Sequence, residues 1–345
     1  MTARYIAEIA SAHEGNPDRI IEICDHITAR TDVSIKLQVF VAEELCASSN
    51  PALEVFKNLQ IPFDVWDRVV SDLRGKGFSV FVEPYGRSAW DWALQDKSLD
   101  LKISGSELTP SRLQVIREEC YINHRDVIIG LAGSTQSEIE RVISALKNLD
   151  FPLPFLQVGF QAFPTATSDL RIGKQFETSR NNGLRFAYAD HTDGGQYDKG
   201  LGVCGAALAL GYQLIEKHVT INREACGSDF FSSINAEEFD AFCSHLRDVE
   251  IAINNPFDSE MSSAELEYRT KFKKYLISSS NITRGDLIDE DNCELLRVDL
   301  DKLGYEGIAS FDFYENLMLG RKMFAKSKIA RGTPVRLSDI DIRNG

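Results

Sequence analysis

Eight short apolar runs alternate with longer segments of helical periodicity over residues 1–255, and this alternation constrains the fold more than any other feature. The runs favour strands, and the segments between them are long enough to be crossover helices. The expected strands are Arg4–Ala10, Val33–Val39, Phe78–Glu83, Leu99–Ile103, Asp126–Leu131, Phe155–Phe160, Leu184–Ala189 and Tyr212–His218. Eight such units in about 250 residues predict an α/β fold of the (β/α)8 TIM-barrel type. A doubly wound open sheet also alternates, but usually with fewer strands.

The remainder of the chain predicts a second, smaller domain. Residues 256–271 are polar and are expected to form a linker, and residues 272–345 return to strand-like and loop-like sequence. Within them the phrases NITRGDLIDEDN and KIARGTPVRLSDI resemble one another. This weak internal repeat favours a compact β-rich module.

Charge and cysteine usage narrow the range of partners. The formal net charge of −14 disfavours nucleic acid, whose phosphates require clustered cations, but allows small anionic ligands. We expect no signal peptide and no membrane segment, since no apolar run approaches about 18 residues. The seven cysteines form no CxxC pair, which indicates reduced thiols in a cytoplasmic protein.

Two lysines interrupt strands that are otherwise suited to burial. They are Lys36 in VSIKLQV and Lys102 in LDLKIS. An unpaired buried ammonium is costly, so each lysine needs an anion. That anion is either a carboxylate neighbour or a ligand phosphate or carboxylate, and we favour the ligand.

Two histidines end neighbouring expected strands. His191 follows the seventh strand and His218 ends the eighth, so their rings are expected to converge. Neutral imidazoles suit a divalent transition ion, and a catalytic site leaves coordination positions open. The pair therefore predicts a metal site at the carboxyl ends of the strands, where barrel enzymes carry their catalytic residues.

Several phrases, taken together and in order, resemble one known family. They are AEIASAHEGN, IKLQ, LKISGSEL, ADHTDG, IEKHVT and GSDFFSS. The chain resembles the N-acetylneuraminate (sialic acid) synthases and their relatives that make legionaminic and pseudaminic acids. Its C-terminal part resembles their antifreeze-like (SAF) domain. The resemblance implies condensation of phosphoenolpyruvate with an N-acetylhexosamine-type sugar, giving a sialic-acid-like 2-keto sugar acid and phosphate for surface polysaccharide biosynthesis.

The resemblance also implies roles for individual residues. His191 and His218 would bind Mn²⁺ or Mg²⁺, and Lys36 and Lys102 would hold phosphoenolpyruvate. Arg297 would reach a partner's sugar across a domain-swapped homodimer. The residues implied to contact or orient the sugar are Glu8, Glu216 and Asp229. Further substrate contacts are expected at Gln38, Ser104, Ser106, Gln161 and Asp190.

The positions at which this sequence differs from the family's motifs are mostly those implied to bind phosphoenolpyruvate. Residues that differ from the usual serine, asparagine or tyrosine are Gly105, Leu131, Gln161, Phe163 and Ala189. Glu83 stands where a threonine would meet phosphate, and it is interpreted either as a catalytic acid or base or as a salt-bridge partner of Lys36 or Lys102. An alternative function is therefore a metal-dependent aldolase, lyase or isomerase that does not use phosphoenolpyruvate. A third is a non-enzymatic sugar-binding or regulatory protein.

Overall fold

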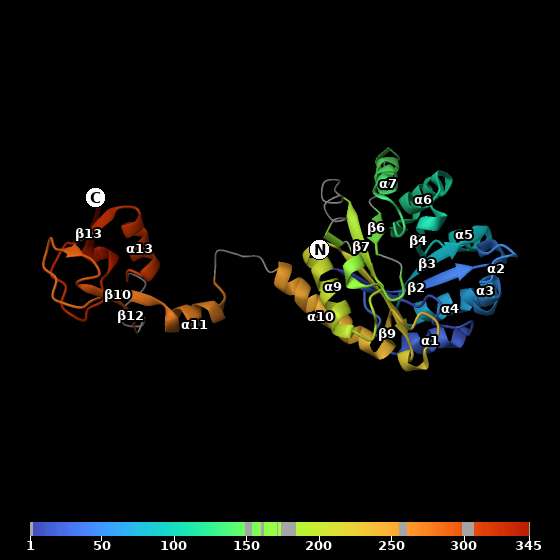
Figure 1. Ribbon diagram of the computed structural model, residues 1–345, viewed down its shortest axis with the longest axis horizontal. Helices are drawn as coiled ribbons and strands as arrows, with labels where there is room; N and C mark the ends of the chain where they lie inside the picture. The colour runs from blue at the N-terminus through green and yellow to red at the C-terminus, as the bar shows by residue number, and fades with distance from the viewer. Residues whose placement is uncertain are drawn as a thin grey trace. The chain divides into compact units, whose positions relative to one another are not determined.

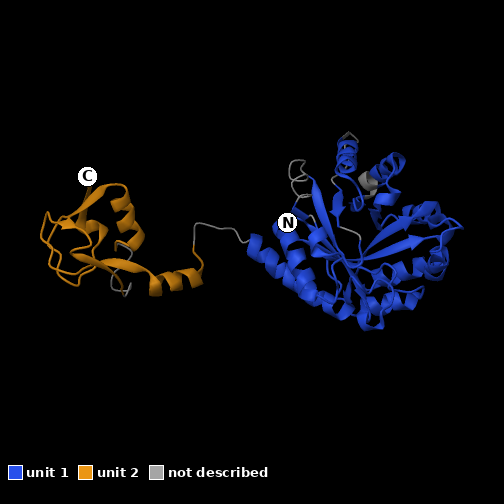
Figure 2. Cartoon of the chain, viewed as in Figure 1, with its two compact units in different colours: residues 1–255 blue, residues 256–345 orange. Residues whose placement is uncertain are grey.

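The chain divides into two compact units, residues 1–255 and residues 256–345 (Figures 1 and 2). The computed structural model describes residues 3–148, 154–159, 162–170, 172–173, 184–254, 261–298 and 307–344. Within those ranges no helix is both long and apolar enough to cross a membrane.

The first unit is a closed barrel of parallel strands surrounded by helices (Figure 1). Its strands are β1 (Arg4–Glu8), β2 (Val33–Phe40), β3 (Ser79–Tyr85), β4 (Asp100–Ile103), β5 (Val127–Gly130), β6 (Phe155–Val158), β7 (Arg185–Asp190) and β8 (Leu214–Thr220). Each pairs with the next in sequence, and β1 also pairs with β8, which closes the ring. The short β9 (Ser233–Asn235) extends the sheet beside β8. The (β/α)8 barrel predicted from the sequence is confirmed.

Helices surround the barrel, and most of them bury apolar side chains against its outer face. They are α1 (Pro17–Asp25), α2 (Ala42–Leu45), α3 (Leu53–Leu59), α4 (Phe63–Gly75), α5 (Gly86–Gln95), α6 (Pro110–Asn123), α7 (Gln136–Asn148), α9 (Tyr197–Ala209) and α10 (Ala236–Asn254). Helix α1 shows why such a helix begins where it does. The Asn16 side chain accepts a hydrogen bond from the Asp18 amide (3.0 Å), and Pro17 occupies the first turn.

The side chains that point into the barrel form two layers. The first layer is apolar and consists of Ile6, Phe81, Ile128, Phe155, Ala187 and Leu214. Successive side chains of a strand point to opposite faces, so the residue two positions further along also points inward. Those positions hold Glu8, Glu83, Gly130, Gln157, Ala189 and Glu216. A layer of polar and small residues therefore follows the apolar one toward the carboxyl ends of the strands.

The second unit is a small module of short strands and helices with its own core. Its elements are α11 (Ser263–Phe272), β10 (Lys274–Ser278), β11 (Leu287–Ile288), β12 (Cys293–Arg297), α13 (Ser310–Met318), β13 (Arg321–Ala325) and β14 (Ile340–Asn344). The two similar phrases pair with each other, because Ile282 and Ile329 exchange both backbone hydrogen bonds at 2.9 Å. Their glycines, Gly285 and Gly332, both have the positive φ that favours glycine.

The segment 256–271, which is expected to link the two domains, contains a helix. Most of it belongs to α11, which begins at a capping box formed by Ser262 and Glu265. The polar composition that indicated a connecting segment belongs to an exposed helix, since no α11 side chain is buried.

Candidate active site

Two lysines and two glutamates form a buried ion cluster inside the barrel mouth. The Lys36 ammonium lies 2.9 Å from Glu83 Oε2 and 2.8 Å from Glu216 Oε1. The Lys102 ammonium lies 3.3 Å from Glu83 Oε2 and 3.0 Å from Glu216 Oε1. Both lysines therefore have carboxylate partners, and the salt bridge expected as one interpretation of Glu83 is present to both of them.

A third carboxylate and an amide complete the cluster. Glu8 contacts Lys36 and accepts a hydrogen bond from the Ala10 amide (2.8 Å). Gln157 donates to Glu216 Oε2 at 2.8 Å. Strand register accounts for the contact between Glu8 and Lys36, because the two residues are paired across β1 and β2.

All three carboxylates of the cluster are fully buried, and two of them have shifted pKa values. Burial alone would raise the pKa of Glu216, but Lys102 and Lys36 outweigh it and hold that pKa well below its usual range. Burial likewise favours a higher pKa for Glu83, but Lys102 and Lys36 outweigh it and lower that pKa. The carboxylates of Glu216 and Glu83 raise the pKa of Lys102 despite its burial. Glu216, Glu83 and Lys102 are therefore charged near neutral pH, whereas burial lowers the pKa of Lys36 against the opposing effect of Glu216 and Glu83.

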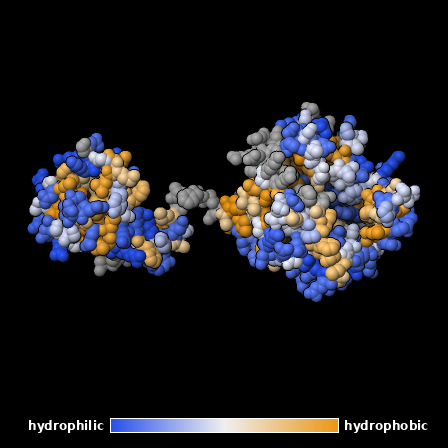
Figure 3. Space-filling view, viewed as in Figure 1, coloured by the Kyte–Doolittle hydropathy of each residue, from blue (hydrophilic) through white to orange (hydrophobic). Residues whose placement is uncertain are grey.

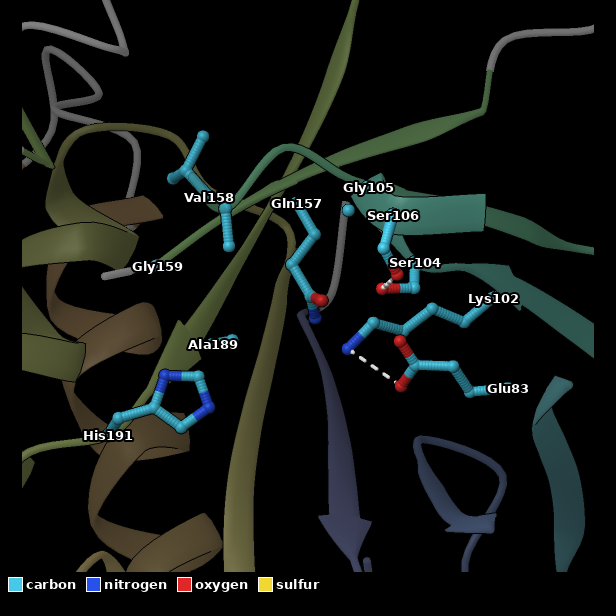
Figure 4. A pocket seen from close by; sticks show the side chains of 12 residues that line it. Glu83, Lys102, Ser104, Gly105, Ser106, Gln157, Val158, Gly159, Ala189 and His191 are labelled. Atoms are coloured by element: carbon cyan, nitrogen blue, oxygen red, sulfur yellow. Dashed lines mark hydrogen bonds and ion pairs between the residues drawn. The ribbon is translucent and has the colours of Figure 1, made fainter. Parts of the chain in front are cut away.

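A polar cavity of about 120 Å³ adjoins the cluster (Figure 4). It is lined by Glu83, Lys102, Ser104, Gly105, Ser106, Gly130, Ala132, Gln157, Val158, Gly159, Ala189 and His191. Figure 4 shows the side chains of Lys102 and Glu83 directed at each other on one side and the His191 ring on the other. The hydroxyls of Ser104 and Ser106 lie 3.1 Å apart beside Lys102. The cavity thus offers a cation, two hydroxyls and an imidazole to a small polar ligand.

The two histidines meet at the same mouth. The ring centroids of His191 and His218 lie 5.2 Å apart, and both side chains are buried. Burial and the neighbouring His191 hold the pKa of His218 well below its usual value, so its ring is neutral. The His218 Nδ1 atom is buried and has no hydrogen-bond partner among the described residues. A neutral ring with a buried, unpartnered nitrogen fits a metal ligand.

No three His, Cys, Asp or Glu side chains in the described ranges are grouped closely enough to hold a metal ion by themselves. A metal ion bound by the two histidines would therefore keep its other positions for water and substrate, as catalytic sites do. Phe163 packs edge-on against both rings, with ring-centroid distances of 5.0 Å to His191 and 6.0 Å to His218.

Sequence comparison identifies the family of this chain. A sequence model of the NeuB family matches residues 25–258, which is more than half of the chain. The chain belongs to the NeuB family. The resemblance seen in the sequence phrases is thereby confirmed.

Known proteins are similar to this NeuB-family chain over most of its length. It is 21% identical to the pseudaminic acid synthase of Campylobacter jejuni subsp. jejuni serotype O:23/36 (strain 81-176), with 97% of this chain and 96% of the relative covered. A spore coat polysaccharide biosynthesis protein E from Chromobacterium violaceum superposes with a TM-score of 0.75 at 17% identity, covering 99% and 100% of the two chains. The N-acetylneuraminic acid (sialic acid) synthetase from Leptospira borgpetersenii, solved with citrate, gives 0.65 at 20% identity over 78% and 92%. These structural likenesses support the barrel fold.

Other residues expected in the site of this NeuB-family chain lie around the cluster rather than in it. Asp190 points away from the cavity, because its carboxylate pairs with buried Lys217 (2.7 Å) and accepts a bond from Thr192 Oγ1 (2.9 Å). It fixes the backbone beside His191 and is not a lining residue. Asp229 is half-buried and accepts a hydrogen bond from the Ser11 amide at 2.8 Å.

Three more residues were expected to contact the substrate, namely Gln38, Arg297 and Gln161. Gln38 is half-buried on β2, in register with Glu83. Arg297 ends β12 in the second unit, where its guanidinium lies 4.7 Å from the Phe272 ring centroid. Gln161 lies outside the described residues.

Tyr85 is a site residue that was not predicted as such, and Gln157 is a polar residue at the end of the sixth strand that had been given no role. Gln157 follows Phe155 by two positions, so strand alternation alone gives its inward direction. Tyr85 follows Glu83 by the same spacing, and burial together with Glu83 raises the pKa of its hydroxyl well above the usual value. Once one residue of a strand is known to point into the barrel, a spacing of two residues therefore predicts the next one that does.

His13 offers a test of how burial at the mouth is linked to stability. Its ring packs edge-on against Trp66, and its Nδ1 accepts a hydrogen bond from the Gly15 amide (2.9 Å). Burial, with a contribution from Arg19, lowers the pKa of His13 to about 4. The unfolded chain therefore takes up this proton first as pH falls, and stability is lost between about pH 6.5 and pH 4.

Replacing His13 with asparagine keeps an acceptor for the Gly15 amide and removes the titration. The fall in unfolding free energy between pH 7 and pH 4.5 should become smaller by about 2 kcal/mol. Urea unfolding of both proteins at the two pH values measures this difference. The same pH dependence in both would show that His13 is not the group responsible.

Proposed function

We propose that this protein condenses phosphoenolpyruvate with an N-acetylhexosamine-type sugar, giving a sialic-acid-like 2-keto sugar acid and phosphate for surface polysaccharide biosynthesis. The observation that carries the proposal is the site itself: in a NeuB-family barrel, one small polar cavity is lined by Lys102, which shares its carboxylate partners with Lys36, and by His191, whose ring lies beside that of His218. Phosphoenolpyruvate is a metabolite of the cytoplasm, so the reaction is proposed there.

The proposed site uses a divalent ion, Mn²⁺ or Mg²⁺, bound by His191 and His218. The buried, unpartnered Nδ1 of His218 supports this assignment. The ion would polarise the aldehyde of the sugar, which makes its carbon a better electrophile.

The remaining roles are assigned to side chains of this chain. Lys102, with the hydroxyls of Ser104 and Ser106, would bind the anion in the cavity that they line. Glu8 and Glu216 would orient the sugar near the histidines, since both lie on strands that end beside them. Asp229 would contact the sugar from the loop after β8, where its carboxylate accepts a hydrogen bond from the Ser11 amide.

We further propose that the second unit is an SAF domain that completes the partner's site in a domain-swapped homodimer. Exposed apolar side chains on α13 support a protein contact, because Phe311 and Met318 are 73% and 87% exposed. The visible face of this unit carries hydrophobic side chains among hydrophilic ones (Figure 3).

Arg297→Ala tests this arrangement. If Arg297 contacts the partner's sugar, its loss should lower kcat/KM for the sugar by about tenfold or more, since charge-assisted hydrogen bonds are worth about 1.5–3 kcal/mol. KM for phosphoenolpyruvate should stay unchanged. Arg331→Ala, an exposed arginine of the same unit, is the matched control. Equal kcat/KM in all three proteins would remove Arg297 from the site.

A second candidate is a metal-dependent aldolase, lyase or isomerase that acts on a sugar or keto acid without phosphoenolpyruvate. One observation favours it: Glu83 is bonded to both lysines and lines the cavity, so the cations proposed for phosphoenolpyruvate are already engaged. In that reaction Glu83 would serve as the acid or base.

Phosphate release separates the two candidates. Purified protein with Mn²⁺ and phosphoenolpyruvate is assayed against a panel of N-acetylated hexosamines and their 6-phosphates, and His191→Ala is the inactive control. The proposed function predicts sugar-dependent phosphate release and a product whose mass is that of a 2-keto sugar acid. Absence of phosphate with every sugar, from protein that binds Mn²⁺, would contradict it and favour the second candidate.

A further inference from the structure

Glu83 differs from the other two carboxylates of the buried cluster in its position. Glu8 and Glu216 contact the lysines but do not line the cavity, whereas Glu83 does both. Its Oε2 atom lies between the two ammonium groups, at 2.9 Å from Lys36 and 3.3 Å from Lys102. A ligand that enters the cavity therefore meets Lys102 and Glu83 together (Figure 4).

The charge of the cavity wall follows from this position. Among its described lining residues, Lys102 is the one lysine or arginine and Glu83 the one acidic residue. Lys102 is already bonded to Glu83 and to Glu216. An incoming anion has to share that ammonium with Glu83 or displace the carboxylate from it, and in either case it lies next to a fixed negative charge.

Repulsion from a fixed carboxylate grows with the charge of the ligand. Two unit charges a few ångströms apart interact strongly in a buried site, because the effective dielectric constant there is far below that of water. Pyruvate carries one negative charge, whereas phosphoenolpyruvate carries its carboxylate and a phosphate of nearly two more. Glu83 therefore opposes the second ligand more than the first.

We propose that Glu83 is a specificity-determining residue that competes with the substrate's anion for Lys36 and Lys102, and that it weakens binding of a phosphorylated anion more than binding of a monocarboxylate. This inference rests on the proposed function to the extent that the cavity holds the anionic substrate. It assigns Glu83 to anion selection rather than to proton transfer.

Calorimetric titration of the full chain with phosphoenolpyruvate and with pyruvate, in the absence of sugar, tests the inference. Glu83→Gln keeps the size of the side chain and removes its charge. It should bind phosphoenolpyruvate at least about tenfold more tightly than the wild type, with a smaller gain for pyruvate. Unchanged or weaker binding of phosphoenolpyruvate, or equal gains for both ligands, would overturn the proposal.

Glu107→Gln is the matched control. Glu107 lies next to Ser106 and pairs with Arg112 at 3.0 Å, away from both lysines. Its loss removes one carboxylate close to the cavity and should change neither affinity appreciably. A gain equal to that of Glu83→Gln would mean that general charge, and not competition for the lysines, sets the affinity.

A second variant and a comparison with turnover complete the test. Should circular dichroism show that Glu83→Gln is unfolded, Glu83→Asp retains the charge but withdraws it from the lysines by one methylene. It should still bind phosphoenolpyruvate more tightly than the wild type, and no gain would overturn the proposal. If the wild type turns over but Glu83→Gln binds phosphoenolpyruvate no more tightly, the competition of Glu83 for the lysines is rejected and the proposed function stands. If Glu83→Gln binds phosphoenolpyruvate more tightly but neither the wild type nor any variant turns over, the proposed function is rejected and the competition stands.

Discussion

Lys36→Met is expected to lower the free energy of unfolding by about 3–5 kcal/mol. Lys36 is fully buried and contacts the carboxylates of Glu8, Glu83 and Glu216. Methionine matches its length but leaves three buried carboxylates with the single ammonium of Lys102. Breaking a buried ion cluster from one side is costly because the remaining charges are uncompensated. Urea unfolding followed by circular dichroism at pH 7 measures the loss.

Lys57→Met is the matched control for this loss. Lys57 is partly exposed on α3 and pairs with Glu54 at the surface (2.9 Å). Exposed ion pairs contribute little, so the unfolding curve of this variant should superimpose on that of the wild type. A Lys36→Met protein as stable as the control would mean that the three glutamates take up protons instead of remaining charged.

His218→Ala is expected to abolish both metal binding and turnover. His218 supplies a buried, neutral imidazole whose Nδ1 has no other partner in the described part of the chain. Residues that only support a metal ligand typically contribute 10–100-fold to metal affinity, so loss of a ligand should exceed about 100-fold. Mn²⁺ binding, followed by electron paramagnetic resonance of the free ion, gives a readout that is independent of activity.

His245→Ala controls for the loss of any histidine, since His245 is exposed on α10. It should bind Mn²⁺ and release phosphate as the wild type does. If His218→Ala still binds Mn²⁺ with wild-type affinity, the metal assignment is wrong. Loss of turnover would then require another explanation, such as misplacement of Glu216, two residues earlier on β8.

The barrel was predictable because its signals are local. Each strand is a short apolar run, and each run is separated from the next by a segment long enough for a helix. The same logic places Glu8, Lys36 and Lys102 at the barrel mouth, since they interrupt or end such runs. Element boundaries were less certain: β1 ends at Glu8, two residues before the expected end at Ala10.

Other parts of the site were not predictable from the sequence, because they depend on which face a side chain takes. Asp190 stands beside His191 and was expected to bind substrate, yet one position along a strand reverses the face, and it pairs with Lys217 outside the cavity. Glu83 had two interpretations, because its partners on β2 and β4 become neighbours only when these strands pair with β3. The helix α11 was missed because it buries no side chain and so carries no apolar periodicity.

The closure of the barrel by β1 and β8 also orders the steps of folding. Lys36 and Glu216 are separated by 180 residues, and Lys102 and Glu216 by 114. Contacts between residues so far apart in the sequence form late. Closing the long loop between them costs conformational entropy before the contact can add stability. On the ribosome, β8 emerges last of the barrel strands, and until it joins β1 the lysines lack one carboxylate. The ion cluster is therefore completed only when the last strand of the barrel has been made, and a chain that lacks β8 leaves both lysines without Glu216 as a partner.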